Sequence, residues 1–221
     1  KWDLEQDNPG LLSDLLCGDE QLLSVEIILS AVNLAEQGRA DQTLAARFAK
    51  DDEHTLWQAL DHDELPRAFT RAVRTHLHRF GDRGLQELKV EQPSLRDTPW
   101  VLMKMIRQYA AQEVTVESYR QHELDVRRRA DSTLASLLQD QPWKFKLLSK
   151  IILPRLRRLI RHRENSRYCR SELFGFSKEI FKALAAYLVS RNVLRDTSDI
   201  YHLTQDEIFG YINGMGVTEN L

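Results

Sequence analysis

The ten residues Phe80–Lys89 read FGDRGLQELK, and they interrupt a sequence that is otherwise poor in glycine and helical in its apolar spacing. Gly81 and Gly84 allow the backbone either positive φ or a close approach to another group. Arg83 and Glu87 are one helical turn apart, so they place opposite charges beside this bend. The segment therefore predicts a charged turn of defined shape between helical regions, which we call the glycine turn.

The sequence before the glycine turn predicts a series of helices. Pro66 opens one in which apolar side chains recur at steps of four and three as far as Phe80. A broad apolar stripe predicts an earlier helix over Asp19–Gln37, with Gly38 placed to end it. Two shorter helices are expected between these, Thr43–Lys50 and His54–Leu60.

After the glycine turn, Leu88–Glu91 alternates in polarity but is too short to found a sheet, so we expect an extended connector. Asp97 before Pro99 is a candidate helix cap, and a helix is expected from there to Ala111. A long helix from about Val116 is expected to form half of a helical hairpin.

The next helix is expected to begin at Pro142 and to bend near Ile151, because Pro154 removes a backbone hydrogen bond. Its apolar spacing predicts a buried stripe made of Leu148, Ile152, Leu156 and Leu159.

The C-terminal part predicts further helix. The range Ile160–Leu194 is expected to be mostly one helix with a cap region at Arg191 and Asn192. Asp199–Leu203 is expected to be extended, and Thr204 to cap a last helix. The predicted fold class is therefore all-α: an irregular multi-helix bundle with long antiparallel helices and little or no sheet.

Composition limits the setting and the domain organisation. The 221 residues contain two cysteines, Cys17 and Cys169, too few for a disulfide framework, so a reducing, cytoplasmic location is expected. No apolar run is long enough for a membrane helix. The chain begins without Met, and we expect a piece of a longer protein. We expect a single helical domain over 1–221, with an acidic subregion 1–80 and a basic subregion 98–213 joined by the connector 81–97.

Charge is distributed unevenly along the chain. Residues 1–66 contain fifteen Asp and Glu against four Lys and Arg, whereas seven arginines and one glutamate lie in Arg155–Arg170. This basic segment suggests a helical interaction module that binds nucleic acid or an acidic protein. The other interpretation is that the arginines of this segment form a solvated helix face or make ion pairs with the acidic N-terminal part of the chain. A sequence pI of about 6.4 argues against nucleic acid as the partner.

No catalytic residue and no metal site are predicted. His76, His78 and His162 lie among charges on expected helices and are interpreted as surface or packing residues. The acidic cluster 61–64 lacks paired ligand spacing on one helix face, so it is interpreted as a solvated loop and not as a metal site. The acidic cluster 51–53 is expected to favour a helix N-terminus through its negative charge.

Three motifs in order resemble a known family. They are the glycine turn, which fits Tyr/Phe-Gly-x-Arg-x-x-x-Glu-Leu, then Arg163-Glu164-Asn165-Ser166-Arg167, then Asp199–Thr204 followed by Glu207. Together they are similar to the helical region of phosphoenolpyruvate-utilising phosphotransferases, of the phosphoenolpyruvate synthase-like and rifampicin phosphotransferase-like kinds.

The resemblance implies a parent enzyme of the ATP-dependent dikinase type. In such enzymes an ATP-binding domain, using ATP and Mg²⁺, phosphorylates a mobile histidine domain that carries the phosphoryl group onward. This fragment would hold no cofactor and would be non-catalytic. It would bind the small-molecule acceptor, or position the ATP-binding and phosphohistidine domains of the same polypeptide, or serve only as a spacer between them.

The resemblance also implies where contacts lie. The residues expected to contact substrate or another domain are Arg83, Glu87, Arg163, Glu164 and Arg167. Arg163 and Arg167, four apart on one helix face, would receive a phosphate or pair with a neighbouring domain, with Glu164 holding Arg167. The alternative for Arg83 and Glu87 is that they satisfy the backbone and each other.

Overall fold

The structure, a computed structural model, describes residues 8–16, 22–83 and 88–215. Every regular element in these ranges is a helix, and they contain no strand, which confirms the predicted all-α class. Compact packing divides the chain into two units. Unit 1 comprises residues 1–78 and 99–168, and unit 2 comprises residues 79–98 and 169–221. The domain organisation expected from composition stays a prediction.

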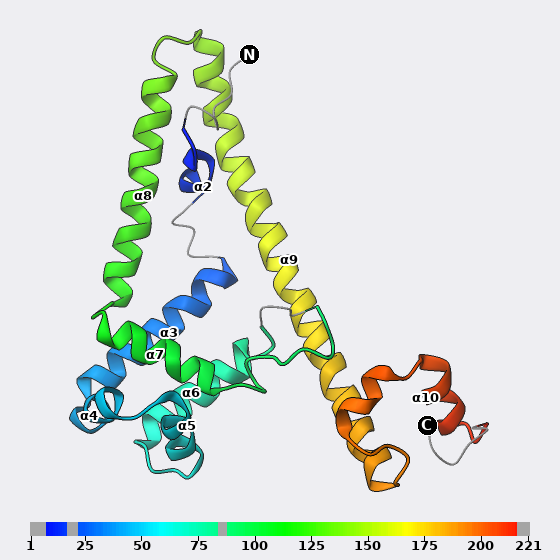
Figure 1. The fold of residues 1–221 in the computed structure, drawn as a ribbon. Helices are drawn as coiled ribbons and strands as arrows, with labels where there is room; N and C mark the ends of the chain where they lie inside the picture. Colours follow the sequence, from blue (N-terminus) through cyan, green and yellow to red (C-terminus); the bar gives the residue numbers. More distant parts are fainter. Residues whose placement is uncertain (1–7, 17–21, 84–87, 216–221) are drawn as a thin grey trace. The chain divides into compact units, whose positions relative to one another are not determined.

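The core of unit 1 forms around two helices, α3 (Leu23–Ala40) and α7 (Trp100–Ala111), which pack against each other (Figure 1). Helix α5 (Glu53–Asp61) covers another side of α7, and α4 (Gln42–Lys50) packs on α3. Helix α6 (Arg67–Phe80) completes this group. The side chains with no exposed surface include Ala31, Val32, Leu56, Leu60, Val73, Leu102, Met103 and Ile106.

Side-chain caps explain where the short helices begin. Asp41 accepts hydrogen bonds from the backbone N–H groups of Thr43 (2.9 Å) and Leu44 (3.1 Å) at the start of α4. Asp52 accepts from Thr55 N–H (2.7 Å) at the start of α5. The acidic cluster 51–53 is therefore a helix boundary, and the predictions of α4, α5 and α6 are confirmed within two residues.

The prediction that Gly38 ends its helix was wrong, because α3 continues through it to Ala40. Gly38 is buried against Phe48 of α4, and a Cβ at this position would overlap the phenylalanine ring. The glycine is therefore required by the close approach of the two helices and not by helix termination.

Two long helices form the rest of unit 1. Helix α8 (Val116–Leu137) and the first part of α9 (Trp143–Ser190) run antiparallel from the turn that joins them, with the short helix α2 (Leu11–Leu15) between them (Figure 1). Thr115 and Ser118 form a capping box at the start of α8. Leu11 and Leu15 of α2 pack against Ala130 of α8, and these three side chains are buried. The partly buried residues packed around them are Leu134, Leu137 and Leu153.

Helix α9 differs from the sequence prediction in its length and in its exposure. It is one continuous helix with Pro154 inside it, whereas we expected one helix from Pro142 and another over Ile160–Leu194. We also expected the stripe from Leu148 to Leu159 to be buried. The exposed fractions are 49% for Leu148, 47% for Ile152 and 62% for Leu159, so the buried-stripe prediction was wrong. Helical periodicity identifies an apolar face but not whether this chain supplies its cover.

Unit 2 contains the glycine turn, the last part of α9, a 3₁₀ helix η1 (Thr197–His202) and α10 (Gln205–Ile212). Its core includes Ala185, Leu188, Val193, Leu194, Ile200 and Ile208. Asn192 ends α9 in the left-handed conformation (φ 57°), which confirms the expected cap.

The short extended segment expected over Asp199–Leu203 was wrong in its main part, because Asp196 caps the 3₁₀ helix η1 there. Thr204 and Glu207 form the capping box that begins α10, as predicted. None of the described helices is long and apolar enough to span a membrane.

Candidate functional site

The glycine turn is closed by the segment that returns from the connector. The backbone N–H of Leu95 donates to the carbonyl oxygen of Arg83 (3.1 Å), and that of Arg96 donates to the carbonyl oxygen of Gly81 (3.0 Å). Gly84 and Glu87 lie outside the described residues, so the expected pairing of Glu87 with Arg83 stays a prediction. The described part is thus a hydrogen-bonded loop that presents Asp82 and Arg96 side by side.

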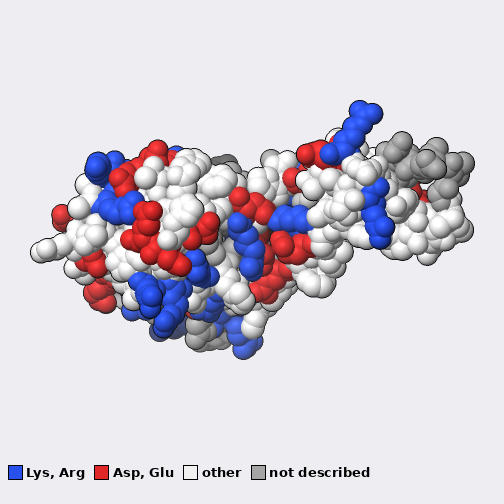
Figure 2. All heavy atoms as spheres, turned by 90° about the horizontal axis from the view of Figure 1, so that it is seen from below, with Lys and Arg blue, Asp and Glu red and all other residues white. Residues whose placement is uncertain are grey.

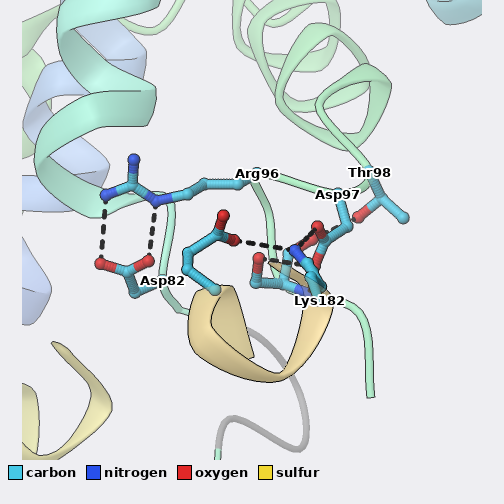
Figure 3. Close-up of polar contacts among 7 residues, drawn as sticks. Asp82, Arg96, Asp97, Thr98 and Lys182 are labelled. Carbon is cyan, nitrogen blue, oxygen red and sulfur yellow. Dashed lines mark hydrogen bonds and ion pairs between the residues drawn. The ribbon is translucent and has the colours of Figure 1, made fainter. Parts of the chain in front are cut away.

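Asp82 and Arg96 form a two-pronged ion pair within this loop (Figure 3). The distances are 2.7 Å from Nε to Oδ1 and 3.1 Å from Nη2 to Oδ2. Helix α9 meets the same carboxylate at Gly175, where an added Cβ would overlap the Asp82 side chain. The bare backbone of Gly175 therefore lets the loop sit directly on α9.

A second ion pair joins the loop to α9 through Asp97 (Figure 3). Its Oδ2 accepts from the backbone N–H of Ser94 (2.8 Å) and from the Ser94 hydroxyl (2.9 Å), and its Oδ1 accepts from Lys182. Burial alone would raise the pKa of Asp97, but the bonds from Lys182 and Ser94 outweigh it and hold that pKa below its usual value. The expectation that Asp97 caps a helix was wrong, since α7 begins after Pro99 without a side-chain cap.

Lys182 is shared between two carboxylates. Besides Asp97, it donates to Oε1 of Glu179 at 2.9 Å, one turn earlier on α9. Burial would lower the pKa of Lys182, but the hydrogen bonds to Asp97 and Glu179 outweigh it and raise that pKa. The ammonium is therefore held in its charged form.

Lys178, one turn before Lys182, has an environment of the opposite kind. It is only 1% exposed, and its ammonium has no hydrogen-bond partner among the described residues. Burial lowers its pKa, against an opposing attraction from Asp97. With the carboxylates of Asp82 and Asp97 already bound to Arg96 and Lys182, this cluster is best suited to fasten the glycine turn to α9.

The second motif forms a local ion-pair triad on α9 in unit 1. Glu164 accepts from Arg163 at 2.8 Å (Nη2) and 3.1 Å (Nε), and from Arg167 at 3.2 Å (Nη1). The hydrogen bond from Arg163 is the main reason that the pKa of Glu164 is lowered. The structure thus brings together these three predicted residues, and the one carboxylate of Glu164 offsets part of the positive charge of the two arginines. A role in phosphate or domain contact stays a prediction.

The motif's asparagine has a structural partner that sequence reasoning missed. Oδ1 of Asn165 accepts from the backbone N–H of Leu23 (3.2 Å) at the start of α3, where Leu22 offers no capping side chain. The side chain of Asn165 therefore caps α3 from a distant helix.

Several charges of the basic segment are also paired. Arg157 donates to the carbonyl oxygen of Leu15 (2.8 Å) at the end of α2 and to Asp131 of α8 (3.1 Å). On the face shown in Figure 2, basic and acidic side chains are interspersed. These contacts favour the ion-pair interpretation of Arg155–Arg170 over an extended phosphate-binding surface.

A groove between α8 and α9 combines apolar and basic side chains. It has a volume of about 680 Å³ and lies wholly in unit 1. Apolar atoms line it from both helices, with basic side chains at the rim. The lining residues include Leu134, Ala135, Leu138, Leu153, Pro154, Lys146, Lys150 and Arg157.

From the sequence, Trp100, Met103, Met105 and Phe145 are candidate residues of an acceptor pocket, and none of them lines this groove. Met103 is fully buried in the core, and Trp100 lies 4.9 Å from the ring of His54, measured between ring centroids. Among the described residues there is also no group of three or more His, Cys, Asp or Glu able to hold a metal.

A family model described as the rifampicin phosphotransferase fourth domain matches residues 1–164. The chain belongs to this family. No curated protein matches the chain. The match confirms the family resemblance drawn from the three motifs, of which the glycine turn and Arg163-Glu164 lie within the matched residues. The groove between α8 and α9 lies within them as well.

Proposed function

We propose that the chain is the acceptor-binding helical domain of a rifampicin phosphotransferase-like enzyme, and that the groove between α8 and α9 binds the acceptor. The observation that carries the proposal is this groove of about 680 Å³ inside the family-matched residues. Its size falls in the range of about 300–1,000 Å³ that is typical of small-molecule sites.

The lining of the groove supports a largely apolar acceptor with oxygen substituents. Leu134 of α8 and Leu138 directly after its end provide apolar surface on one side, and Leu153 of α9 provides it on the other. Lys150 at the rim provides an exposed ammonium that suits an acceptor oxygen. Polar groups of this kind fix the orientation of a ligand that apolar contacts hold.

In this proposal the chemistry belongs to other domains of the parent phosphotransferase. The ATP-binding domain would hold ATP and Mg²⁺, and the phosphohistidine domain would bring the phosphoryl group to the acceptor. The charged residues Arg83, Glu87, Arg163, Glu164 and Arg167 would contact those domains or the substrate. The competing role is a spacer that only positions the two catalytic domains.

Rifampicin is the natural first probe, since the family carries its name. We expect the chain to bind it saturably in calorimetry. Ala135→Trp should weaken binding at least tenfold, because Ala135 is exposed and lines the groove, so an indole there fills it. Ala186→Trp is the matched control, an exposed alanine of α9 outside the groove lining, and should leave binding unchanged.

Absence of binding by the unmodified chain would favour the spacer role. Equal weakening by both tryptophan variants would place the acceptor elsewhere. Phosphotransfer by the chain alone, with ATP supplied, would contradict the assignment of the chemistry to other domains.

A further inference from the structure

Helix α6 carries a second concave surface that the proposed acceptor site does not use. Its volume is about 710 Å³, and it lies wholly in unit 1. All of its lining comes from α6 and from Asp63 in the connection between α5 and α6. The lining residues are Asp63, Arg67, Thr70, Arg71, Arg74, Thr75 and His78.

The spacing of the basic side chains follows from the helix period. Arg67, Arg71, Arg74 and His78 are separated by four, three and four residues, so they share one face of α6. At a rise of about 1.5 Å per residue, the Cα atoms of the three arginines span about 10 Å along the helix axis. All three arginines are exposed. The cavity wall is therefore a short row of cations.

Few acidic groups oppose this row. Asp63 is the one acidic residue of the lining, and it lies 3.6 Å from Arg74 with both side chains more than half exposed. The guanidinium groups of Arg67 and Arg71 have no hydrogen-bond or ion-pair partner among the described residues, although the carbonyl oxygen of Arg71 accepts from the hydroxyl of Thr75 (2.9 Å). By contrast, Arg39 uses its guanidinium to bond the carbonyl oxygens of Tyr109 (3.1 Å) and Val114 (2.8 Å).

The cavity also contains a buried polar group without a partner. Thr70 is 5% exposed, and its hydroxyl oxygen has no hydrogen-bond partner in the described chain. A buried hydroxyl that is left unsatisfied is destabilising. An acceptor supplied by a ligand in this cavity would satisfy it.

We propose that this surface binds the phosphate groups of a small oligophosphate. Guanidinium groups match phosphate oxygens in two-pronged geometry, and a row of three suits an anion with two or more linked phosphates. The hydroxyl of Thr70 donates to the same anion. A row of about two helical turns in a concave site fits a small ligand. Binding along a nucleic-acid duplex would demand cations over a longer span.

The test uses the whole chain and tripolyphosphate, pyrophosphate and inorganic phosphate as probes in calorimetry. We expect saturable binding that weakens in that order. Arg67→Gln with Arg71→Gln should raise the Kd for tripolyphosphate at least tenfold. Arg158→Gln with Arg170→Gln removes the same charge from exposed positions of α9 and should change the Kd less than twofold.

Thr70→Val separates a ligand role from a structural one. Valine keeps the shape and removes the unsatisfied hydroxyl, so the melting temperature without ligand should stay the same or rise. The Kd for tripolyphosphate should still rise at least threefold. Binding that is absent, that falls equally in both double-arginine variants, or that is unaffected by Thr70→Val overturns the proposal. None of these variants touches the α8 and α9 groove, so rifampicin binding should persist in all of them.

Discussion

Gly175→Ala is the substitution that tests most sharply how the glycine turn is held on α9. Alanine would place a Cβ 2.7 Å from Cβ of Asp82 and closer still to the carboxylate. The carboxylate is fixed by its ion pair with Arg96, whose side chain is 35% exposed against 19% for Asp82. The clash must therefore displace the loop or break the pair.

The size of the effect follows from three contributions. Alanine in a helix interior is more favourable than glycine by about 1 kcal/mol. Overpacking of a close contact costs about 1–3 kcal/mol. Loss of a half-exposed, two-pronged ion pair adds about 1 kcal/mol. The net expectation is that unit 2 loses about 1–3 kcal/mol of stability.

Amide hydrogen exchange over 176–190 reports this change within unit 2. Gly210→Ala is the control, since Gly210 is also helical in unit 2 and a Cβ there meets nothing within 4 Å. Gly210→Ala should slow amide exchange, because alanine stabilises a helix relative to glycine. In an Asp82→Gly background, which removes the Cβ of residue 82 as well as its carboxylate, Gly175→Ala should become neutral or stabilising, because the clash is gone. If Gly175→Ala and Gly210→Ala behave alike, or if the cycle shows no coupling, the close-approach argument is refuted.

Three further substitutions have defined outcomes. Burial lowers the pKa of His76 to about 4. As the pH falls below about 6.5, the unfolded chain therefore binds a proton at His76 that the folded chain does not bind, and the folded state loses stability. His76→Gln should reduce the drop in melting temperature between about pH 7 and pH 5. Asn165→Ala should lower the free energy of unfolding by about 1 kcal/mol in urea denaturation through loss of the cap on Leu23, and no change would contradict that contact. The pKa of Asp97 is lowered and that of Lys182 is raised, so their ion pair stabilises the fold between about pH 4 and pH 10. This stabilisation is lost as the pH falls through the folded-state pKa of Asp97 or rises through that of Lys182. Asp97→Asn should lower the melting temperature at pH 7 but remove part of the further decline below pH 4, and an unchanged acid profile would count against the pair.

Local signals were enough to predict most helices. Pro66 opens α6, and Thr204 caps α10, because each acts through its own fixed φ or its own side chain within one turn. Gly38 and Asp97 misled the prediction for one reason. Glycine and aspartate are both common at helix ends, but here neither residue ends or caps a helix. Gly38 lets α3 approach Phe48 closely, and Asp97 forms an ion pair with Lys182.

The candidate sites were less accessible to sequence reasoning. Lys182 and Asp97 are 85 residues apart, and no periodicity relates them. Only the triad of Arg163, Glu164 and Arg167 was predicted as a group, because its spacing within one helix is local. The α8 and α9 groove is lined by ordinary apolar and basic side chains that resemble core and surface residues until the two helices are placed.

The most direct test of the central claim is hydrogen exchange of the chain with and without rifampicin. If the groove binds the acceptor, protection should appear in peptides from 131–139 of α8 and 146–157 of α9, the segments that supply its lining. Ala135→Trp should abolish that protection. Saturable binding with protection confined to other segments, or no protection at saturating rifampicin, would contradict the assignment of this groove as the acceptor site.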